Sequence, residues 1–348
     1  MIRIYKCPGC GSDLRYEGGT DTLVCAHCQT KVKVSELEMK EEAGVSVGLT
    51  GGTEEAVDTD GDGIREYRCP ACGAELVTDE YTAATLCSFC GSPALIEGRL
   101  SGAFRPSRLI PFSFDKKQAG EHFKEWAKSG RLTPSDFKSD ATMAKLTGIY
   151  VPYWLYSYTT TAEFSGTAEI VRVSRRGDEE ITDTSTYKVH RVVTADYSQV
   201  PFDASEKAPD ESMHYLEPYD YGKLVPFSLP YLSGYFAEKF NADAEAFREG
   251  IQGSLASDIL NAAVASVSEY HTVHVQQSHV DFSNEETEYV MLPVWTLNYT
   301  YHGKTYPLYM NGSTGQVDGE LPTSIEKVIA LFLGIGLVIF LLMFFLMR

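Results

Sequence analysis

The pattern of apolar and polar residues changes along the chain, and its clearest feature is one long apolar run. Residues 328–347 contain no charged side chain, no proline and no amide side chain. These 20 residues give a helix about 30 Å long, which matches the thickness of a bilayer's hydrocarbon core. The pattern therefore predicts one transmembrane helix over residues 326–347. A buried core helix is the alternative interpretation.

Residues 104–323 mix two periodicities. Apolar residues at helical spacing predict an amphipathic helix over residues 115–128 and a longer helix over residues 243–267. Aromatic and β-branched runs predict strands over residues 151–173, 185–197, 271–282 and 289–301. Trp154, Trp295 and the tyrosines are expected to build the core and its rim, with an aromatic groove for peptide or lipid as the alternative. The expected fold is an α+β domain.

Two faint internal echoes occur in the same region. Residues 151–154 (Val-Pro-Tyr-Trp) match residues 292–295 (Leu-Pro-Val-Trp) at a displacement of 141. Residues 109–114 (Leu-Ile-Pro-Phe-Ser-Phe) resemble residues 224–229 (Leu-Val-Pro-Phe-Ser-Leu). The echoes raise the hypothesis that the domain consists of two related halves.

The N-terminal region contains a tandem repeat of one cysteine module. All eight cysteines occur in four Cys-x-x-Cys pairs, and the second set is displaced from the first by 62 residues. Each module has 14 residues between its pairs, which is typical of a ribbon that binds zinc through four thiolates. We predict two small β-rich zinc ribbons, over residues 1–40 and 65–103. The expected ligands are Cys7, Cys10, Cys25 and Cys28 for one Zn²⁺ ion and Cys69, Cys72, Cys87 and Cys90 for the other.

The Cys-Pro-x-Cys-Gly turns suit zinc knuckles for physical reasons. Pro8 and Pro70 fix one backbone torsion early in the turn. Gly11 and Gly73 permit the left-handed conformation that lets backbone N–H groups point at sulfur. A closed four-thiolate site is structural, because it leaves no coordination position for water. A redox Cys-x-x-Cys pair or an iron–sulfur cluster is the alternative.

The first module departs from the second at one position. Gln29 follows Cys28, whereas Gly91 follows Cys90. A non-glycine residue held left-handed costs about 1–2 kcal/mol, so the first ribbon is expected to bind zinc less tightly. His27 lies inside the second cysteine pair, but four thiolates already complete a tetrahedron, which favours a bystander role for its imidazole.

Residues 41–64 connect the two modules. They contain seven acidic residues, no basic ones and six glycines, which predicts a flexible, self-repelling linker. Residues 58–63 (Asp-Thr-Asp-Gly-Asp-Gly) imitate the start of a calcium-binding EF-hand loop. The twelfth position of such a loop needs a bidentate Glu, and Cys69 stands there, so calcium binding is disfavoured.

Composition and charge restrict the class of partner. The hydrophobic content of 43% can support a core. The balance of 30 Lys and Arg against 48 Asp and Glu gives a formal charge of −18, which repels phosphate backbones. Neither ribbon has a basic surplus: residues 1–40 carry six basic and five acidic side chains, and residues 65–105 carry four and five. Nucleic acid is therefore an unlikely partner.

The sequence segments that resemble enzyme motifs each lack a required residue or structural context. Gly303-Lys304-Thr305 resembles the end of a phosphate-binding loop, but Asn298 stands where the first glycine belongs, and the segment reads as a hairpin. The region of His271 and His274 reads as a strand, which sends these two side chains to opposite faces. We find no nucleophile triad and no paired carboxylates. The expectation is a protein without enzymatic activity.

The order of motifs resembles a known bacterial family over nearly the whole chain. Two Cys-Pro-x-Cys-Gly modules precede residues 148–154 (Gly-Ile-Tyr-Val-Pro-Tyr-Trp), 201–205 (Pro-Phe-Asp-Ala-Ser) and 310–315 (Met-Asn-Gly-Ser-Thr-Gly). The chain thereby resembles membrane-anchored proteins with tandem TFIIB-type zinc ribbons, encoded beside phage shock protein A homologues in envelope-stress operons. The resemblance implies that this chain is itself a membrane docking partner. It would draw a phage shock protein A homologue, which is a peripheral protein, to the bilayer. Some relatives carry helicase-like names, which no phosphate-binding motif here supports.

These observations define the expected function and location. The preferred hypothesis is a membrane-anchored cytosolic adaptor that recruits a phage-shock-type or scaffold protein, and the alternative is a nucleic-acid-binding ribbon protein of transcription or replication type. Clustered cysteines without an N-terminal apolar signal region favour a reducing compartment, so the N-terminal domains are expected on the cytoplasmic side of the cell membrane. Lys327 and Arg348 flank the two ends of the apolar run, so local charge does not decide the orientation.

Overall fold

The computed structural model describes residues 1–45, 48–51, 54–55, 64–207 and 209–347. The chain forms two compact units. The first comprises Met1–Pro152, Ser205–Asn241 and Val290–Arg348, and the second comprises Tyr153–Ala204 and Ala242–Tyr289. Both cysteine modules therefore belong to the same unit as part of the expected α+β region.

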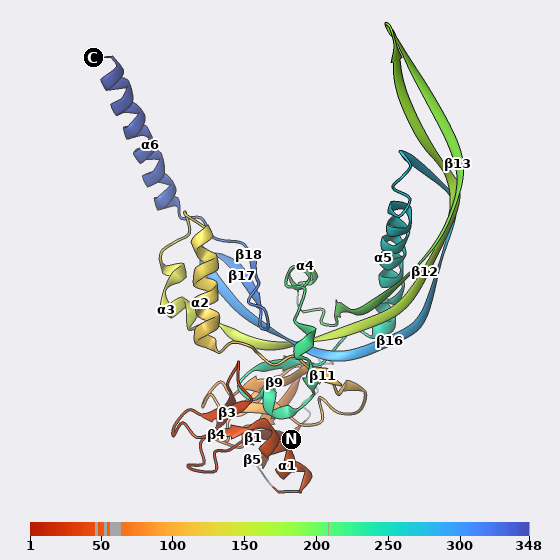
Figure 1. The fold of residues 1–348 in the computed structure, drawn as a ribbon. Coiled ribbons are helices and arrows are strands. Elements are labelled where there is room, and N and C mark those ends of the chain that lie inside the picture. Colours follow the sequence, from red (N-terminus) through yellow and green to blue (C-terminus); the bar gives the residue numbers. More distant parts are fainter. Residues whose placement is uncertain (46–47, 52–53, 56–63, 208, 348) are drawn as a thin grey trace. The chain divides into compact units, whose positions relative to one another are not determined.

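The first cysteine module is a three-stranded antiparallel sheet followed by a short helix (Figure 1). Its elements are β2 (Leu14–Tyr16), β3 (Thr22–Cys25), β4 (Lys31–Lys33) and α1 (Val34–Glu42). Leu14 pairs with Cys25, and Leu23 pairs with Val32. All four side chains are buried, as expected for strands that present alternate residues to one covered face.

The second module divides its strands between two sheets. A small sheet contains β6 (Glu54–Glu55), β7 (Arg65–Arg68) and β8 (Glu75–Thr78), while β9 (Thr82–Leu86) and β10 (Pro93–Ile96) belong to the largest sheet. Strand β1 (Ile2–Tyr5), which precedes the first cysteine pair of the first module, pairs with β10 of the second module, with Ile2 opposite Ile96. The two modules are thus joined by a shared sheet and are not independent domains.

The described residues between the modules include two short strands that were not predicted. Helix α1 continues to Glu42, β5 (Gly48–Gly51) pairs with β1, and β6 pairs with β7. Gly48 approaches β1 so closely that a Cβ atom would lie 2.2 Å from the carbonyl oxygen of Ile4. At these described strands the structure differs from the expected flexible linker, because their backbones pair with β1 and β7 despite the acidic, glycine-rich composition. The disfavoured calcium loop at residues 58–63 lies outside the described residues.

Both cysteine modules pack directly on the rest of the first unit. Strand β9 pairs with β15 (Phe236–Glu238), and the backbone N–H of Tyr16 donates to the carbonyl oxygen of Ser233 at 2.8 Å. The ring of Tyr16 contacts that of Tyr235, which stacks on Phe112 with centroids 4.2 Å apart. Trp295 lies edge-on to Phe112, in the same core. The prediction that Trp295 is a core residue is confirmed.

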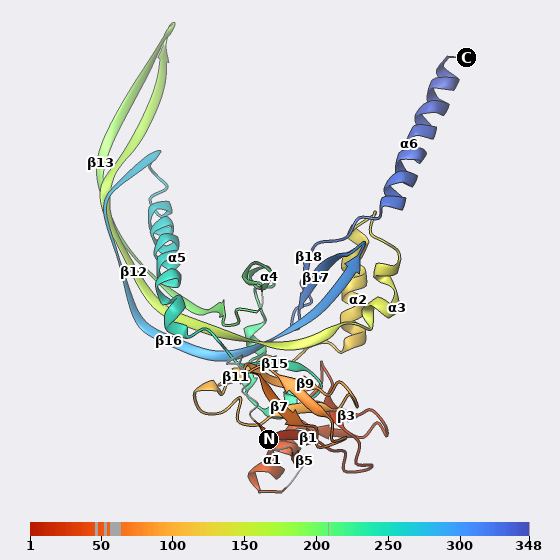
Figure 2. The same ribbon diagram turned by 180° about the vertical axis from the view of Figure 1, so that it is seen from behind.

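Further helices and several short strands also belong to the first unit (Figure 2). Helix α2 (Lys116–Trp126) begins at a capping box formed by Asp115 and Gln118, and it buries Phe123. Helix α3 (Asp140–Met143) follows. The remaining strands are β11 (Arg108–Leu109), β14 (Val225–Pro226), β17 (Lys304–Asn311) and β18 (Val317–Gly319), and a short helix, α4 (Asp210–Tyr215), precedes β14. The helix predicted over residues 115–128 is confirmed.

The second unit consists of long antiparallel strands covered by one helix (Figure 1). Its elements are parts of β12 (Thr147–Arg176), β13 (Glu179–Asp203) and β16 (Thr272–Tyr301), together with α5 (Ala244–Ala265). Tyr156 and Tyr158 of β12 pack against Ile251 and Leu255 of α5. The indole N–H of Trp154, which is half-buried, donates to the carbonyl oxygen of Ala242 at 2.9 Å.

Strand β16 runs without a break where the sequence predicted two strands. The polar residues 283–288 have the composition of a turn, and Asn284 adopts a positive φ of 51°. They nevertheless continue the strand, and the Ser283 hydroxyl donates to the carbonyl oxygen of Thr159 on β12 at 3.2 Å. Because these positions are mostly exposed, polar side chains are compatible with an extended strand here.

The echo segments lie on neighbouring strands. Strands β12 and β16 are adjacent in the largest sheet, and the Thr296 hydroxyl donates to the carbonyl oxygen of Thr147. The other pair of echoes forms β11 and β14, which run antiparallel with Leu109 opposite Val225. Antiparallel pairing of similar segments is the arrangement that a local two-fold axis produces.

The last element is α6 (Ile325–Leu346), a helix of 22 residues with mean hydropathy 3.1 over its most apolar window. None of that window is buried. Among the described residues, α6 is the one helix long and apolar enough to cross a membrane. The predicted multidomain fold is confirmed: two β-rich cysteine modules, an α+β region and one apolar C-terminal helix.

Candidate metal centres

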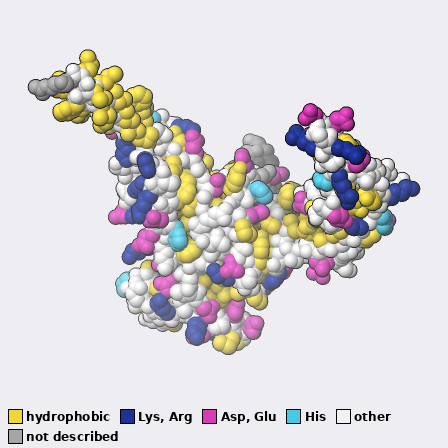
Figure 3. Space-filling view, turned by 45° about the horizontal axis from the view of Figure 1, so that its top comes forward, with side chains coloured by type: hydrophobic (Ala, Val, Ile, Leu, Met, Phe, Trp, Pro, Cys, Tyr) yellow, Lys and Arg dark blue, Asp and Glu magenta, His cyan; other side chains and the backbone are white. Residues whose placement is uncertain are grey.

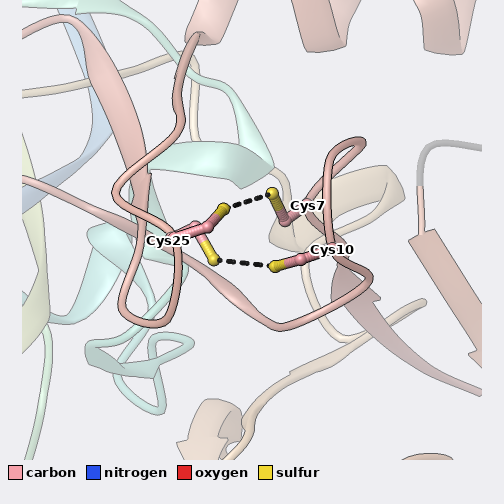
Figure 4. Close-up of side chains that lie close together, drawn as sticks. Cys7, Cys10 and Cys25 are labelled. Carbon is pink, nitrogen blue, oxygen red and sulfur yellow. Dashed lines mark hydrogen bonds between the residues drawn. The ribbon is translucent and has the colours of Figure 1, made fainter.

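The four cysteines of the first module converge on one point, and Figure 4 shows three of them, Cys7, Cys10 and Cys25, with their sulfurs turned toward one another. Cys7 and Cys10 lie on the turn after β1, whereas Cys25 ends β3 and Cys28 lies on the turn before β4. The Sγ atoms of Cys7 and Cys28 are 3.5 Å apart, as are those of Cys10 and Cys25. All four sulfurs lie within 4.8 Å of one another.

The second module repeats this arrangement. Its Sγ separations are 3.9 Å between Cys69 and Cys90 and 3.8 Å between Cys72 and Cys87. These four sulfurs also lie within 4.8 Å of one another. In both modules the first cysteine of each pair is buried and the second is exposed.

The backbone turns explain how each knuckle holds its sulfurs. The N–H of Gly11 donates to the carbonyl oxygen of Cys7 at 2.9 Å, and Gly11 has a left-handed φ of 74°. Gly73 and Gly91 repeat this conformation in the second module, with φ of 79° and 72°. Gln29 occupies the fourth such position with φ of 60°, so the predicted left-handed glutamine is confirmed.

The sulfur spacing fits one metal ion in each module. A tetrahedron with metal–sulfur bonds of 2.3 Å has edges of about 3.8 Å, which the separations of 3.8 and 3.9 Å in the second module match. The first module is tighter at 3.5 Å. Four sulfurs this close enclose room for a single ion and none for a cluster of several irons. Each group can therefore hold one metal ion of the kind that four thiolates select.

Hydroxyl groups flank the exposed thiol at the end of each set. Thr30 Oγ1 lies 3.0 Å from Cys28 Sγ, and Ser92 Oγ lies 3.2 Å from Cys90 Sγ. The hydrogen bond from Thr30 lowers the pKa of Cys28. Burial opposes ionisation of Cys90, but hydrogen bonds with the side chain and backbone of Ser92 outweigh burial and lower the pKa of Cys90 to about 6. These hydroxyls were not among the predicted site residues, although Thr30 and Ser92 occupy equivalent positions, two residues after the last cysteine of each module.

The other residues considered from sequence play no part in these centres. His27 is exposed and lies outside the group of four sulfurs. His302 and Gly303 form the turn of the β16–β17 hairpin, both with positive φ, so the phosphate-loop resemblance is a hairpin. His271 Nδ1 accepts a hydrogen bond from the backbone N–H of Val171 at 3.1 Å.

Comparisons with known proteins identify one relative over nearly the full length. The chain is 37% identical over 336 residues to the uncharacterized protein YdjG of Bacillus subtilis (strain 168), a match that covers 97% of this chain and 95% of the relative. No family model matches the sequence, and no solved structure matches the fold. The chain belongs to the same protein family as YdjG of Bacillus subtilis.

Proposed function

We propose that this protein is a membrane-anchored zinc-ribbon adaptor that recruits a phage-shock-type or scaffold protein to the membrane during envelope stress. The observation that carries the proposal is the combination, in one chain, of two four-sulfur centres with a helix whose most apolar window is not buried. An exposed helix of this length and hydropathy needs a hydrocarbon environment.

In this proposal both centres hold zinc in a structural role. Four thiolates around one ion leave no open position for water, so the ion supplies folding energy and no Lewis-acid chemistry. Free thiols of this number persist in reducing compartments. The cysteine modules therefore face the cytoplasm, and α6 forms a single pass through the cell membrane.

The second ribbon offers a protein-binding surface. Phe89 lies between Cys87 and Cys90 at the tip of the knuckle, with 77% of the residue exposed, and Val77 on β8 is 63% exposed. Exposed apolar residues on a rigid, metal-fixed turn are typical of contact sites for protein partners. The corresponding positions in the first ribbon are His27 and Arg15, so this apolar pair is specific to the second module.

The proposal is tested by locating the phage-shock-type protein in cells that lack this chain. We expect that protein to move from the membrane fraction to the soluble fraction, and the full-length chain to restore it. The variant Phe89→Ser should fail to restore recruitment, whereas the matched variant His27→Ser should succeed. A partner that stays on the membrane without this chain contradicts the adaptor function.

Nucleic-acid binding is the alternative function, and the purified full chain can be used to test it. A salt-dependent shift of labelled DNA by the detergent-solubilised full chain is the expected result of that function. The near-neutral charge of both ribbons, with six basic and five acidic residues in residues 1–40, argues for no shift.

A further inference from the structure

The loop after α2 lies beside the point where the chain enters α6. The backbone N–H of Ser324 donates to the carbonyl oxygen of Leu132 at 2.7 Å. The Lys327 ammonium donates to the carbonyl oxygen of Thr133 at 2.6 Å. Lys327 is the last charged residue before the uncharged run of residues 328–347. Residues 132 and 133 therefore lie level with the start of the apolar segment.

The region around this loop is basic in a strongly acidic chain. Residues 116–145 contain seven Lys and Arg against four Asp and Glu, whereas the whole chain has 30 against 48. Figure 3 shows Lys and Arg side chains gathered next to the base of the apolar helix. Lys117, Lys124 and Lys128 follow one another at helical spacings of seven and four residues, so they share one side of α2 and its extension. The seven residues are Lys116, Lys117, Lys124, Lys128, Arg131, Lys138 and Lys145.

Several of these cations remain available to a ligand. Lys124 pairs with Asp140, and Lys128 pairs with Glu125. The acidic partners are 97% and 72% exposed, and ion pairs this exposed contribute little. Arg131 is exposed and forms no ion pair with any residue that the structure describes. An anion of higher local charge density can therefore compete for all three cations.

The distance to the bilayer headgroups is short. Arg131 is two residues from Thr133, which places its Cα within about 7 Å of the contact with Lys327. The headgroup layer extends roughly 5–8 Å beyond the hydrocarbon core, and electrostatic attraction acts over a Debye length of about 8 Å at physiological salt. Arg131 thus lies within reach of lipid phosphates if α6 spans the membrane, and Lys128 precedes it by three residues.

We propose that Lys124, Lys128, Arg131 and Lys327 form a site for anionic phospholipid headgroups in the leaflet that α6 enters. This inference rests on the membrane anchoring in the proposed function and not on the recruitment of a partner. It also orients the chain, because basic residues next to a membrane helix favour the cytoplasmic side. In the sequence only Lys327 flanks the apolar run on this side, whereas folding brings the other three cations to it.

An acidic protein segment is the competing occupant, and the contacts favour lipid. The basic residues are joined to α6 through Leu132 and Thr133, so any bilayer around α6 already brings phosphates to them. A protein partner would have to compete with that effective concentration.

The test is hydrogen–deuterium exchange of the full chain in lipid nanodiscs. One set contains phosphatidylcholine alone, and the other contains phosphatidylcholine and phosphatidylglycerol at a ratio of about 7:3. We expect exchange of residues 127–133 to slow about five-fold with the anionic lipid, the factor that one basic residue near an anionic surface supplies. Sodium chloride at about 0.5 M should reverse the effect by screening.

A double variant supplies the control for charge. Lys128→Gln with Arg131→Gln should lose the response to phosphatidylglycerol, while Lys188→Gln, an exposed lysine on β13, should retain it. Failure of the chain to enter nanodiscs overturns the anchoring itself. Entry followed by equal exchange in both lipids overturns the headgroup site alone, as does protection by an acidic peptide without any by phosphatidylglycerol.

Discussion

The two cysteine modules share a motif but differ in what surrounds their sulfurs. Cys7 and Cys25 lie in the main hydrophobic core, together with Tyr150 and Trp295 of the α+β region. Cys69 and Cys87 belong to a separate cluster of eight buried residues. The first centre therefore lies in the main core, whereas the second lies in a smaller cluster, to which β1 contributes Ile2 and Ile4, and is expected to depend more on the metal.

The contacts that attach the two modules to the rest of the first unit also differ in how deeply they are buried. The first module is fixed by a buried hydrogen bond, from the Ser233 hydroxyl to the carbonyl oxygen of Leu14 at 2.7 Å. The second is fixed in part by an ion pair between Asp79 and Lys207, whose side chains are each 40% exposed. The comparison explains why a strained residue, Gln29, is tolerated in the first module: the surrounding core holds the turn in place.

Removing one ligand from each module should produce the largest effect. Cys7→Ser and Cys69→Ser are each expected to reduce the metal content from two ions to one, with a loss on the order of 10 kcal/mol of binding free energy at that site. In Cys69→Ser, hydrogen exchange of the backbone amides should become fast throughout β7 and β8. In Cys7→Ser the strands β2 and β3 should stay partly protected, because Leu14, Tyr16 and Leu23 remain in the main core. Equal loss of protection in both variants would remove the distinction between the modules.

The buried hydroxyl gives the next largest effect. Ser233→Ala leaves the carbonyl oxygen of Leu14 without its partner, which should lower the free energy of local opening of β2 by about 1–3 kcal/mol. Hydrogen exchange of the β2 amides measures this opening. The control is Ser101→Ala, because the Ser101 hydroxyl is exposed and donates to the carbonyl oxygen of Gly98, three residues away. No change in Ser233→Ala would show that the first module is not held by this contact.

Exchanging the residues after the last cysteines tests the strain directly. Gln29→Gly should tighten metal binding to the first centre by about 1–2 kcal/mol, since the left-handed conformation no longer carries a Cβ penalty. Gly91→Gln should weaken the second centre by a similar amount. Competition with a chromophoric chelator measures both. Opposite signs for the two variants support the account, and a neutral Gly91→Gln would contradict it.

The exposed ion pair should give the smallest effect. Partial burial opposes ionisation of Asp79, but the ion pair with Lys207 and hydrogen bonds from Thr82 lower its pKa. The contribution to stability is therefore present above the unfolded pKa of 3.8 and is lost as the pH falls through the lower folded value. At pH 7, raising the salt to about 1 M should weaken the attachment of β8 and β9 by at most about 1 kcal/mol and leave β2 unchanged. Asp79→Asn should abolish the salt dependence.

The sequence contains the local chemistry of both centres. The displacement of 62 residues, the knuckle glycines and the departure at Gln29 all describe turns of a few residues, and local turns are determined by local residue types. Helix α2 was predictable for the same reason, because Asp115 and Gln118 form its cap three residues apart.

The pairing of strands that are distant in the chain could not be predicted from the sequence. Strand β1 pairs with β10, more than 90 residues away, and β5 joins it from a segment with the composition of a linker. Short strands of alternating residues carry little information about which edge they join. The basic residues beside α6 are likewise distant in sequence from Lys327, so their combined charge appears only after folding.

The central claim is that one chain holds two structural zinc ions and is fixed in a membrane by its last helix. The most direct measurement is metal analysis of the full chain, solubilised in detergent from membranes that were first washed with alkaline carbonate. The account predicts that the chain survives the wash and carries two zinc ions per polypeptide. Release of the chain into the wash, or a retained chain without zinc, would contradict it.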